Sequence, residues 1–431
     1  MKISVIGAGY VGLVTGSCFA DLGNDVICMD NDAAKVKKLK GGKIPIYEPG
    51  LEDLIKRNIK ERRLSFTSSI KDAVKRSDII FICVGTPPRD NGEADLSFVE
   101  HVARDIARSM SSYKLIIEKS TVPVNTGEWV EHTIKTCNKG SIKFDVASNP
   151  EFLREGSAIK DFMNPDRIVI GVKSKKAKDI LAELYRPLKS EMVITDIKSA
   201  ELIKHASNSF LAMKISFINA VSNVCDKLGT DVNEVASGIG LDKRIGKDFL
   251  NAGIGFGGFC FPKDLRAFIR IAEKCGYDFG MLKEVERVNE MQKAVLLKKV
   301  EEMIWNLQNK TLGVLGLSFK PDTDDIRYSP AIEIISALRK DGVRIKVYDP
   351  AAMAKARAVL GSGIKFCKDA YDVAKGCDCL IVATEWNEFK ELDLKRVKRL
   401  MRQPVIIDGR NIYDPEGVKA LGFKYSGMGR G

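Results

Sequence analysis

Apolar runs of strand length alternate with longer amphipathic stretches from the start of the chain to about residue 150. The runs read KISVIG, DVICMD, DIIFICVG, KLIIEKS and FDVASNP, and the helix-length stretch VGLVTGSCFADLG separates the first two. Such alternation is typical of βαβ units, in which helices cover both faces of a parallel sheet. The pattern predicts a doubly wound parallel sheet, and we expect this first domain to cover residues 1–196.

The middle of the chain changes to helical periodicity. Between Ser199 and Leu228 apolar residues recur at spacings of three and four, which predicts one long amphipathic helix. The same spacing predicts helices over Pro262–Gly276 and Phe279–Leu307. We therefore expect a central helical domain over residues 197–308. The apolar positions of the long helix include Leu202, Ala206, Phe210, Met213, Phe217, Ala220 and Val224.

A second alternating region completes the chain. It contains TLGVLGLSF, RIKVYDP, CDCLIVATEW and PVIIDGR, and Ser329-Pro330 marks a helix start because a capping residue precedes proline at the first helical position. These runs parallel those of the first domain. We expect a second Rossmann-like domain over residues 309–431, so the predicted fold class is α/β, with two Rossmann-like doubly wound parallel sheets joined by a helical domain. Ligands of such sheets lie beyond the carboxyl ends of the strands, and each domain could hold one nucleotide.

Composition agrees with a large folded protein. The 431 residues are 45% hydrophobic and 29% charged, and the length exceeds what one hydrophobic core usually serves. The opening MKISVIGAGY leads directly into a strand pattern, so we expect no export signal. No window approaches the roughly 18 consecutive apolar residues of a membrane-spanning helix. We therefore expect a soluble, cytoplasmic protein.

Cysteine, histidine and charge exclude several classes of site. The ten cysteines are scattered, none forms a Cys-x-x-Cys pair, and only three histidines are present. We therefore expect neither a disulfide framework nor a metal. The net charge of +12 is dispersed along the chain. A mildly basic surface that attracts anionic small molecules is a plainer explanation than binding of nucleic acid or membrane.

A glycine fingerprint directly follows the first strand pattern. Gly7, Gly9 and Gly12 form G-x-G-x-x-G at the opening of a helix, where backbone N–H groups and the helix dipole can bind a pyrophosphate. Asp30 ends the second strand pattern, at the separation expected of a carboxylate that binds the ribose hydroxyls. This combination predicts NAD rather than NADP, although the nearby Lys35 could tolerate a 2′-phosphate. The alternative is an ordinary glycine turn.

Two proline-containing turns follow later strands. Thr86-Pro87 belongs to VGTP and Thr121 belongs to STVP, both at the edge of the sheet where a dinucleotide lies. Alone, either could be a structural turn. Beside the glycine fingerprint they are candidates for loops on the nicotinamide side.

A glycine-rich segment over Asn251–Asp264 departs from helix and strand patterns. Its sequence, NAGIGFGGFCFPKD, has four glycines that permit close approach of the backbone to a bulky group. Cys260 is followed by Lys263, and a neighbouring cation lowers the pKa of a thiol and makes it more nucleophilic. We expect Cys260 to be reactive; the alternative is a buried structural thiol.

The sequence resembles the UDP-glucose/GDP-mannose dehydrogenase family over essentially its whole length. The resemblance rests on GAGYVGL, VGTP, EKSTVPV, NPEFLREG, ELIKHASNSFLAMKISFIN, GIGFGGFCFPKDL, LGLSFKPDTDDIR and DGR, in the family's order. NPEFLREG and the FPKD ending resemble the UDP-glucose branch. The resemblance implies NAD-dependent, four-electron oxidation of a sugar C6 alcohol to a carboxylate, with Cys260 as nucleophile.

Roles for six catalytic candidates follow from the resemblance. Lys204 and Asn208 are four residues apart on the predicted long helix and so share one face. The resemblance implies that Lys204 holds the C6 oxygen and that Asp264 acts as a base with it. It further implies that Glu155 activates water against a thioester and that Thr121 orients this water. Without the resemblance, Lys204 is more simply explained as a surface lysine. Glu151 and Glu155 are then more simply explained as charges that interact with a helix dipole. The catalytic candidates are Cys260, Lys204, Asp264, Glu155, Thr121 and Asn208.

The resemblance also implies two sets of binding residues. Lys320 and Arg410 supply cations for a diphosphate. Arg244 is similar to an arginine that enters the sugar site of a neighbouring subunit, which implies at least a homodimer. Each charged residue, taken singly, is more simply a solvated surface charge. The cofactor set is Gly7, Gly9, Tyr10, Val11, Gly12, Asp30, Lys35, Thr86, Pro87, Thr121, Glu155, Lys263 and Arg327. The substrate set is Glu151, Phe152, Leu153, Lys204, Asn208, Arg244, Phe256, Gly257, Gly258, Phe319, Lys320 and Arg410.

One residue departs from the family pattern, and other activities stay open. Phe259 precedes Cys260 where many relatives carry serine, which leaves the exact sugar undetermined. Relatives acting on GDP-mannose or a UDP-N-acetylhexosamine are the nearest alternatives. A second alternative is a β-hydroxyacid dehydrogenase. Cys260 and the C-terminal domain argue against it, because such an enzyme needs neither a reactive cysteine nor a second nucleotide domain. A third alternative is a non-catalytic protein that binds NAD and a nucleotide sugar.

Overall fold

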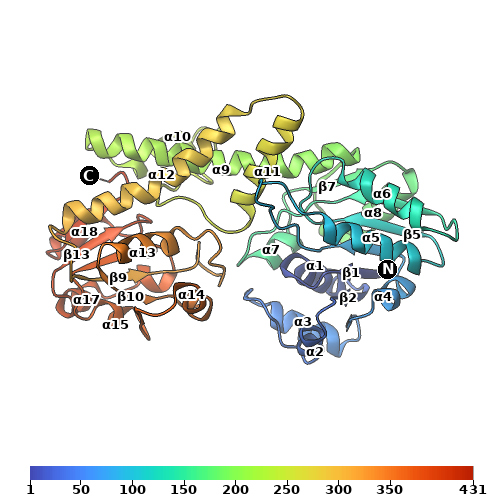
Figure 1. Cartoon of the computed structure of the whole chain (residues 1–431), viewed down its shortest axis with the longest axis horizontal. Coiled ribbons are helices and arrows are strands. Elements are labelled where there is room, and N and C mark those ends of the chain that lie inside the picture. The colour runs from blue at the N-terminus through green and yellow to red at the C-terminus, as the bar shows by residue number, and fades with distance from the viewer. Residues whose placement is uncertain (431) are drawn as a thin grey trace. The chain divides into compact units, whose positions relative to one another are not determined.

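Each of two units of the chain is built on one β-sheet. The computed structural model (Figure 1) describes residues 1–430. The first unit consists of Met1–Ser207 with Arg266–Tyr277, and the second of Asn208–Leu265 with the chain from Asp278 onward.

The first unit contains an eight-stranded sheet in the order β3-β2-β1-β4-β5-β6-β7-β8. All neighbouring strands are parallel except β6 and β7, which pair antiparallel. The predicted doubly wound parallel sheet is thus confirmed, with one reversed pair after a connection that carries the short helix α7 (Ala158–Met163). The strands are β1 (Lys2–Ile6), β2 (Asp25–Met29), β3 (Leu64–Thr67), β4 (Ile79–Ile82), β5 (Lys114–Glu118), β6 (Phe144–Ser148), β7 (Ile168–Val172) and β8 (Met192–Thr195).

Helices cover both faces of this sheet, which explains why its strands are continuous apolar runs. Side chains alternate between two cores: Val5 and Phe81 belong to one, and Ile6 and Ile80 belong to the other. The helices are α1 (Tyr10–Asp21), α2 (Ala33–Lys40), α3 (Leu51–Lys60), α4 (Ile70–Arg76), α5 (Ser97–Ser109), α6 (Thr126–Cys137), α7 (Ala158–Met163) and α8 (Lys175–Tyr185).

The second unit contains a six-stranded parallel sheet in the order β11-β10-β9-β12-β13-β14. The predicted helix start at Ser329-Pro330 is confirmed, because α13 begins at Pro330. The strands are β9 (Thr311–Leu315), β10 (Arg344–Tyr348), β11 (Ile364–Phe366), β12 (Cys379–Val382), β13 (Val405–Asp408) and β14 (Lys424–Gly427). The helices are α10 (Val232–Gly240), α12 (Gly280–Met303), α13 (Pro330–Lys340), α14 (Met353–Leu360), α15 (Ala370–Ala374), α16 (Asn387–Lys390), α17 (Leu394–Leu400) and α18 (Pro415–Ala420).

Two helices are shared between the units. The predicted long helix is α9 (Ile197–Leu228), and α11 spans Cys260–Lys274. The contact pattern divides α9 after Ser207, whereas the sequence boundaries at 196 and 308 follow the change of periodicity. The division into three domains therefore stays a prediction.

The expectation that the whole segment Asn251–Asp264 is irregular was wrong at its end. Cys260 to Asp264 form the first turn of α11, which starts two residues before the predicted helix. Pro262 is compatible with this turn because the first N–H groups of a helix have no intrahelical acceptor. Among residues 1–430, no helix has the length and apolar character needed to cross a bilayer.

Candidate active site

The turn between β1 and α1 has the geometry of a dinucleotide-binding turn. Gly7 has a φ of +101°, and a Cβ there would lie 2.6 Å from the carbonyl oxygen of Cys83. A Cβ on Gly12 would lie 1.8 Å from the carbonyl oxygen of Gly7. Gly9 differs, because its Cβ position has no atom within 4 Å. Gly7 and Gly12 therefore allow the turn to form, and Gly9 leaves open space at the N-terminus of α1.

Asp30 organises this turn from the end of β2. Its carboxylate accepts hydrogen bonds from the backbone N–H groups of Ala8 and Asp32, each at 3.0 Å. Lys35 donates to the same carboxylate at 2.9 Å. The predicted pair Asp30 and Lys35 is thus in direct contact, beside the glycine turn.

These residues fit NAD. Open space at Gly9 adjoins N–H groups at the start of α1, which suit a pyrophosphate. The carboxylate of Asp30 suits a ribose diol and opposes a 2′-phosphate.

The two proline turns are joined to each other and to α9. Thr86 donates its hydroxyl hydrogen to the carbonyl oxygen of Thr121 at 2.9 Å, and Ser120 donates to the carbonyl oxygen of Val84 at 2.8 Å. The ring Nε2 of His205 lies 2.8 Å from the carbonyl oxygen of Val122. The loop that carries Thr121 is therefore fixed between the sheet edge and the long helix.

Glu48 is a structural contact that sequence reasoning missed. Its buried carboxylate accepts hydrogen bonds from the hydroxyl of Tyr10 and from the N–H groups of Gly156 and Ala158, the latter two at 2.6 and 2.8 Å. Burial, followed by Glu48 and then the charge of Glu155, raises the pKa of Tyr10 above its usual range. The start of α1 is thus tied to the turn that carries Glu155. Only the fold reveals this, because the partners are 38 to 110 residues apart.

Lys204 and Glu151 form a buried ion pair with 3.2 Å between Nζ and Oε1. The ring of Phe152 lies 5.2 Å from the same Nζ, and on this ring the guanidinium of Arg167 stacks at 3.6 Å. Glu151 also accepts from the N–H of Leu153 at 2.6 Å. The structure thus brings the predicted residues Glu151, Phe152 and Lys204 together, and it adds Arg167.

In the second unit, the predicted nucleophile Cys260 is exposed at the first position of α11. The N-terminus of a helix favours an anion, so this position suits a thiolate. Asp264, one turn later, is fully buried; it pairs with Lys263 at 2.7 Å and accepts from Asn208 Nδ2 at 2.6 Å. The predicted site residues Asn208, Lys263 and Asp264 are therefore in contact within the same unit.

The glycines before Cys260 pack against the chain itself. A Cβ on Gly257 would lie 2.2 Å from the carbonyl oxygen of Tyr328, and one on Gly258 would lie 2.7 Å from the ring of Phe319. Phe256 is held by Asn289, whose Oδ1 accepts from its N–H at 2.7 Å. The bulky group that the sequence predicted for this loop is thus partly another loop of the same unit, and Asn289 is a contact that the sequence did not signal.

Arg327 lies beside the residue that departs from the family pattern. Its guanidinium carbon is 4.3 Å from the ring centre of Phe259, and its Nη2 pairs with Asp325 at 2.6 Å. The ammonium of Lys263 lies 5.6 Å from the same ring. The aromatic ring before Cys260 is therefore in contact range of two cations.

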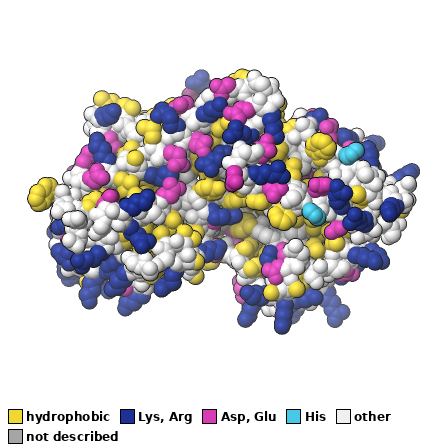
Figure 2. Space-filling model, viewed as in Figure 1, with side chains coloured by type: hydrophobic (Ala, Val, Ile, Leu, Met, Phe, Trp, Pro, Cys, Tyr) yellow, Lys and Arg dark blue, Asp and Glu magenta, His cyan; other side chains and the backbone are white. Residues whose placement is uncertain are grey.

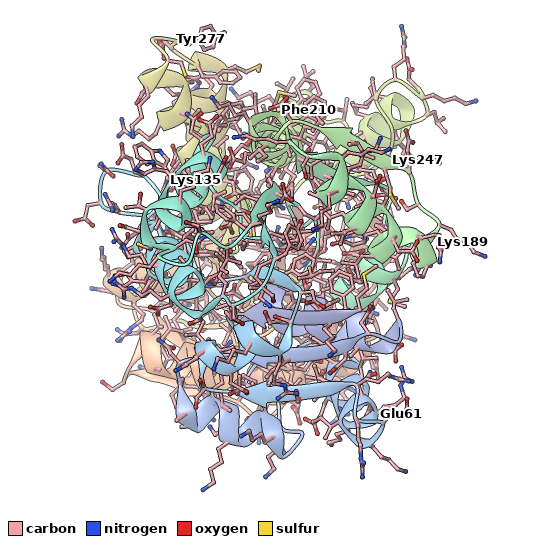
Figure 3. All side chains as sticks on the ribbon, turned by 90° about the vertical axis from the view of Figure 1, so that its right-hand side faces the viewer. Glu61, Lys135, Lys189, Phe210, Lys247 and Tyr277 are labelled. Carbon is pink, nitrogen blue, oxygen red and sulfur yellow. The ribbon has the colours of Figure 1, made fainter. Side chains whose placement is uncertain are left out.

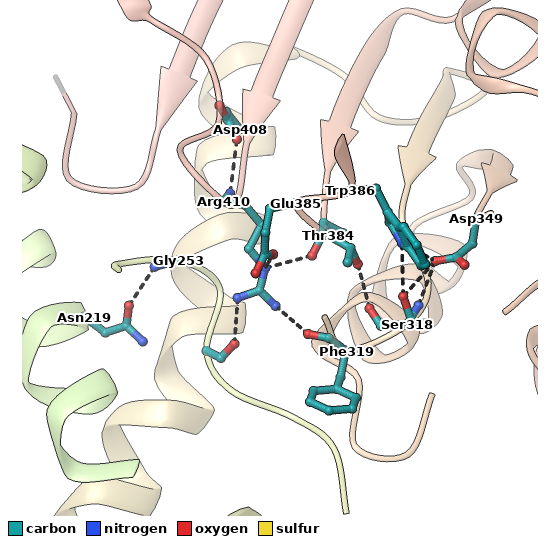
Figure 4. A network of polar contacts seen from close by, with 12 residues as sticks. Asn219, Gly253, Ser318, Phe319, Asp349, Thr384, Glu385, Trp386, Asp408 and Arg410 are labelled. Carbon is teal, nitrogen blue, oxygen red and sulfur yellow. Dashed lines mark hydrogen bonds and ion pairs between the residues drawn. The ribbon is translucent and has the colours of Figure 1, made fainter. Parts of the chain in front are cut away.

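Arg410 donates hydrogen bonds to several backbone carbonyl groups of its own unit, as Figure 4 shows. It donates to Ala383, Gly255 and Phe319 at 2.9, 3.1 and 3.3 Å. Arg410 was predicted to bind a diphosphate. It also has a structural role, because it holds the loop before Cys260 against the C-terminal sheet. Lys320 Nζ lies 5.7 Å from the ring of Phe319.

The predicted residue Arg244 is exposed and pairs with Asp242 at 2.6 Å. The first unit carries the cofactor turn and the predicted residues from Glu151 to Glu155 with Lys204, whereas the second carries Cys260, the other predicted substrate residues and the cofactor candidates Lys263 and Arg327. Within residues 1–430, no group of three or more His, Cys, Asp or Glu side chains is arranged to hold a metal ion.

Charged side chains of both signs occur on the visible face of each unit (Figure 2). In Figure 2, Lys and Arg side chains occur across the visible faces of both units, with Asp and Glu between many of them. This distribution accompanies the net charge of +12.

Comparison with known proteins identifies matching domains along the chain. Residues 1–189 match the NAD binding domain of the UDP-glucose/GDP-mannose dehydrogenase family, residues 198–291 its central domain and residues 313–415 its UDP binding domain. The chain is 49% identical to UDP-glucose 6-dehydrogenase TuaD of Bacillus subtilis over 429 residues, covering 100% of this chain and 93% of the relative.

Solved structures agree. A UDP-glucose dehydrogenase from the hyperthermophilic archaeon Pyrobaculum islandicum superposes with a TM-score of 0.93 at 42% identity, covering 100% of this chain and 98% of that one. A UDP-D-ManNAc dehydrogenase from Pyrococcus horikoshii has a TM-score of 0.88 at 30% identity, with 100% of both chains covered.

The fold and the glycine turn define an NAD-dependent oxidoreductase with a second, UDP-binding domain. The chain belongs to the UDP-glucose/GDP-mannose dehydrogenase family. The family resemblance seen in the sequence and the prediction of NAD as cofactor are both confirmed.

Proposed function

We propose that the protein is a UDP-glucose 6-dehydrogenase, which converts UDP-glucose, two NAD and water into UDP-glucuronate and two NADH with release of protons. The carrying observation is the exposed thiol of Cys260 at a helix N-terminus, one turn before the buried Asp264. A dehydrogenase that performs only one hydride transfer has no use for such a nucleophile. The names of relatives that match the whole chain support the same activity.

NAD held by the glycine turn and Asp30 would supply the hydride acceptor for each of the two oxidations at C6 of the sugar. Between the two, the thiolate of Cys260 adds to the C6 aldehyde carbon, and the resulting thiohemiacetal is oxidised to a thioester. Water then cleaves the carbon–sulfur bond, which releases the carboxylate and returns the thiol.

Other residues act on oxygen and on protons. Lys204 binds the C6 oxygen and stabilises negative charge as it develops, and its ion pair with Glu151 fixes its ammonium in place. Asp264 takes up protons in the alcohol oxidation, with Asn208 orienting its carboxylate. Glu155 activates the hydrolytic water, which Thr121 orients.

Binding of both ligands follows the residues expected from the family. The cofactor contacts the turn Gly7–Gly12, Asp30, Lys35, Thr86, Pro87, Thr121, Glu155, Lys263 and Arg327. The UDP-sugar contacts Glu151, Phe152, Leu153, Phe256, Gly257, Gly258, Phe319, Lys320 and Arg410, together with Lys204 and Asn208.

The protein also acts as a homodimer or higher homo-oligomer in this proposal. Three apolar side chains of α9, each seven residues from the next, are more than half exposed: Phe210, Phe217 and Val224. Phe210 is marked in Figure 3. Such a row on one face of a helix suits a symmetric helix pair. The exposed Arg244 is available to reach a partner's sugar site. We further propose a cytoplasmic location and a role in supplying UDP-glucuronate for polysaccharide synthesis.

The first test is the yield of NADH from limiting UDP-glucose. The parent is expected to give two NADH per sugar, and Cys260→Ser is expected to lose turnover at least 100-fold, because a hydroxyl is a far weaker nucleophile than a thiolate. One NADH per sugar from the parent would overturn the thioester mechanism.

The same assay separates the alternatives. Reduction of NAD with GDP-mannose or a UDP-N-acetylhexosamine in place of UDP-glucose would identify another branch of the family. Binding of NAD and UDP-glucose without NADH from any of these sugars would indicate a non-catalytic protein.

A further inference from the structure

A lysine with no assigned role is buried behind the Lys204–Glu151 ion pair in the first unit. Lys119 directly follows β5, and it is only 5% exposed. Burying an ammonium group is costly unless the protein supplies hydrogen-bond acceptors and compensating charge. The surroundings of Lys119 therefore indicate what its charge does.

The ammonium of Lys119 is bonded to the start of the turn that presents Glu151. Its Nζ donates to Oδ1 of Asn149 at 2.9 Å and approaches the hydroxyl of Tyr185 at 3.4 Å. Asn149 is fixed further, because its N–H donates to the carbonyl oxygen of Glu118 and its Nδ2 to that of Val169, at 2.9 and 2.7 Å. Two residues after Asn149, Glu151 pairs with Lys204.

Four other titratable groups face Lys119 from neighbouring elements. Cys83 follows β4, Glu151 follows β6, Tyr185 ends α8, and Lys204 lies on α9. Burial lowers the pKa of Lys119 to about 8; the nearby Glu151 opposes this shift, and repulsion by Lys204 adds to it. Burial also raises the pKa of Cys83 and Tyr185 well above the usual range, so both are neutral near pH 7. Glu151 is the carboxyl group that the two buried lysines have in common as a neighbour.

We propose that Lys119 is a positioning residue for the dehydrogenase reaction, whose charge and hydrogen bond to Asn149 hold Glu151 against Lys204. This inference rests on the proposed function, because it concerns the lysine that binds the C6 oxygen. Lys119 itself contacts neither substrate nor cofactor in this scheme. Its hydrogen bond to Asn149 keeps the turn that carries Glu151 in place, and the carboxylate of Glu151 in turn fixes the ammonium of Lys204.

The test compares Lys119→Met with Lys114→Met in the full-length protein. Lys114 is a matched control, because it is also a buried lysine of the β5 segment and donates to a backbone carbonyl group, that of Ser77. At pH 7 we expect Lys119→Met to lower kcat at least tenfold while KM for UDP-glucose and NAD changes less than threefold. Lys114→Met is expected to keep kcat within about twofold.

The dependence on pH separates positioning by charge from a purely structural role. Because Lys119 loses its proton as the pH rises through about 8, the ratio of parent kcat to Lys119→Met kcat should be largest near pH 6.5 and fall severalfold by about pH 9. Lys119→Arg, which keeps a positive charge, should restore part of kcat at pH 7. The ratio of its kcat to that of Lys119→Met should stay constant across this pH range.

Several outcomes would overturn the inference. A ratio that is independent of pH, or equal kcat losses in Lys119→Met and Lys114→Met, would assign Lys119 to stability alone. If Lys119→Met does not fold, Lys119→Gln serves instead, because it removes the charge but keeps a polar side chain: an unchanged kcat and pH profile there would also reject the proposal. Two NADH per UDP-glucose from the parent in the same assay keeps these outcomes separate from a failure of the proposed function.

Discussion

At the scale of single residues, the glycine turn and Asp30 show how far local sequence reaches. The fingerprint was predictable because its requirements are local: Gly7 needs a positive φ, and Gly12 needs the absence of a side chain five residues later. Glu48, Lys119 and Asn289 gave no such signal. Each bonds to residues 30 or more positions away, and those contacts exist only after the sheet has formed.

Two alanine substitutions separate binding from folding in this turn. Gly9→Ala should leave the free energy of unfolding within about 1 kcal/mol of the parent, because its Cβ meets no protein atom. It should weaken NAD binding at least tenfold, because the methyl group occupies the space beside the start of α1. Gly12→Ala should destabilise the protein by about 3 kcal/mol or more, because its Cβ overlaps the carbonyl group of Gly7.

Thermal unfolding and titration with NAD measure the two effects. Unchanged NAD affinity in a well-folded Gly9→Ala variant would show that the cofactor does not approach this glycine.

At the scale of secondary structure elements, the helix α9 fastens other parts of the first unit. The buried carboxylate of Glu201 accepts from the N–H groups of Asn125 and Gly127 at 2.8 and 2.7 Å and so caps the N-terminus of α6. His205, one turn later, contacts the loop with Thr121. The long helix was predictable from periodicity, but its capping of another helix was not, since Asn125 and Glu201 are 76 residues apart.

The cap predicts a dependence of stability on pH. Burial raises the pKa of Glu201 to about 7, although the hydrogen bonds from Gly127 and Asn125 oppose the shift. A carboxyl group with a higher pKa in the folded state binds its proton more tightly there, so its contribution to stability is present below about pH 4.5 and is lost as the pH rises to about 7. Glu201→Gln removes this titration.

Urea unfolding at pH 5 and at pH 8 measures the difference. From pH 5 to pH 8 the parent should lose stability that Glu201→Gln does not lose. The free energy of unfolding of Glu201→Gln minus that of the parent should therefore increase by roughly 2–3 kcal/mol. The same difference at both pH values would mean that Glu201 titrates normally in the folded protein.

At the scale of the whole molecule, the chain repeats one architecture for two purposes. Both sheets place a buried aspartate at the end of the second strand of the fold: Asp30 after β2 and Asp349 after β10. Asp349 accepts from the N–H groups of Leu317 and Ser318 at 2.7 and 3.0 Å, and the indole of Trp386 lies 3.3 Å away. No glycine fingerprint follows β9, and α13 begins 15 residues after this strand ends. The second sheet thus keeps the architecture without the NAD turn.

The exposed apolar row of α9 predicts how copies of the chain assemble. Phe217→Glu places a charge in the exposed apolar row of α9, and it should shift the protein from a dimer or larger oligomer toward a monomer, because an ionised carboxylate is costly to bury in an interface. Trp305→Glu is the matched control, since Trp305 is 98% exposed but lies outside α9, after the end of α12. Sedimentation velocity over a range of concentrations measures the mass. A monomeric parent, or equal dissociation in both variants, would contradict this assignment of the interface.

The sequence by itself determined the two α/β sheets, the long helix, the cofactor class and the identity of the candidate nucleophile. Each depends on a local pattern: alternating strand and helix periods, a glycine turn before a helix, or a cysteine in a motif of fixed spacing. Tertiary structure decided the rest. It placed Cys260 at a helix N-terminus, paired Lys204 with Glu151, engaged Arg410 with backbone carbonyl groups and buried Lys119 beside Asn149. These arrangements depend on burial and on contacts between distant segments, which no local pattern encodes.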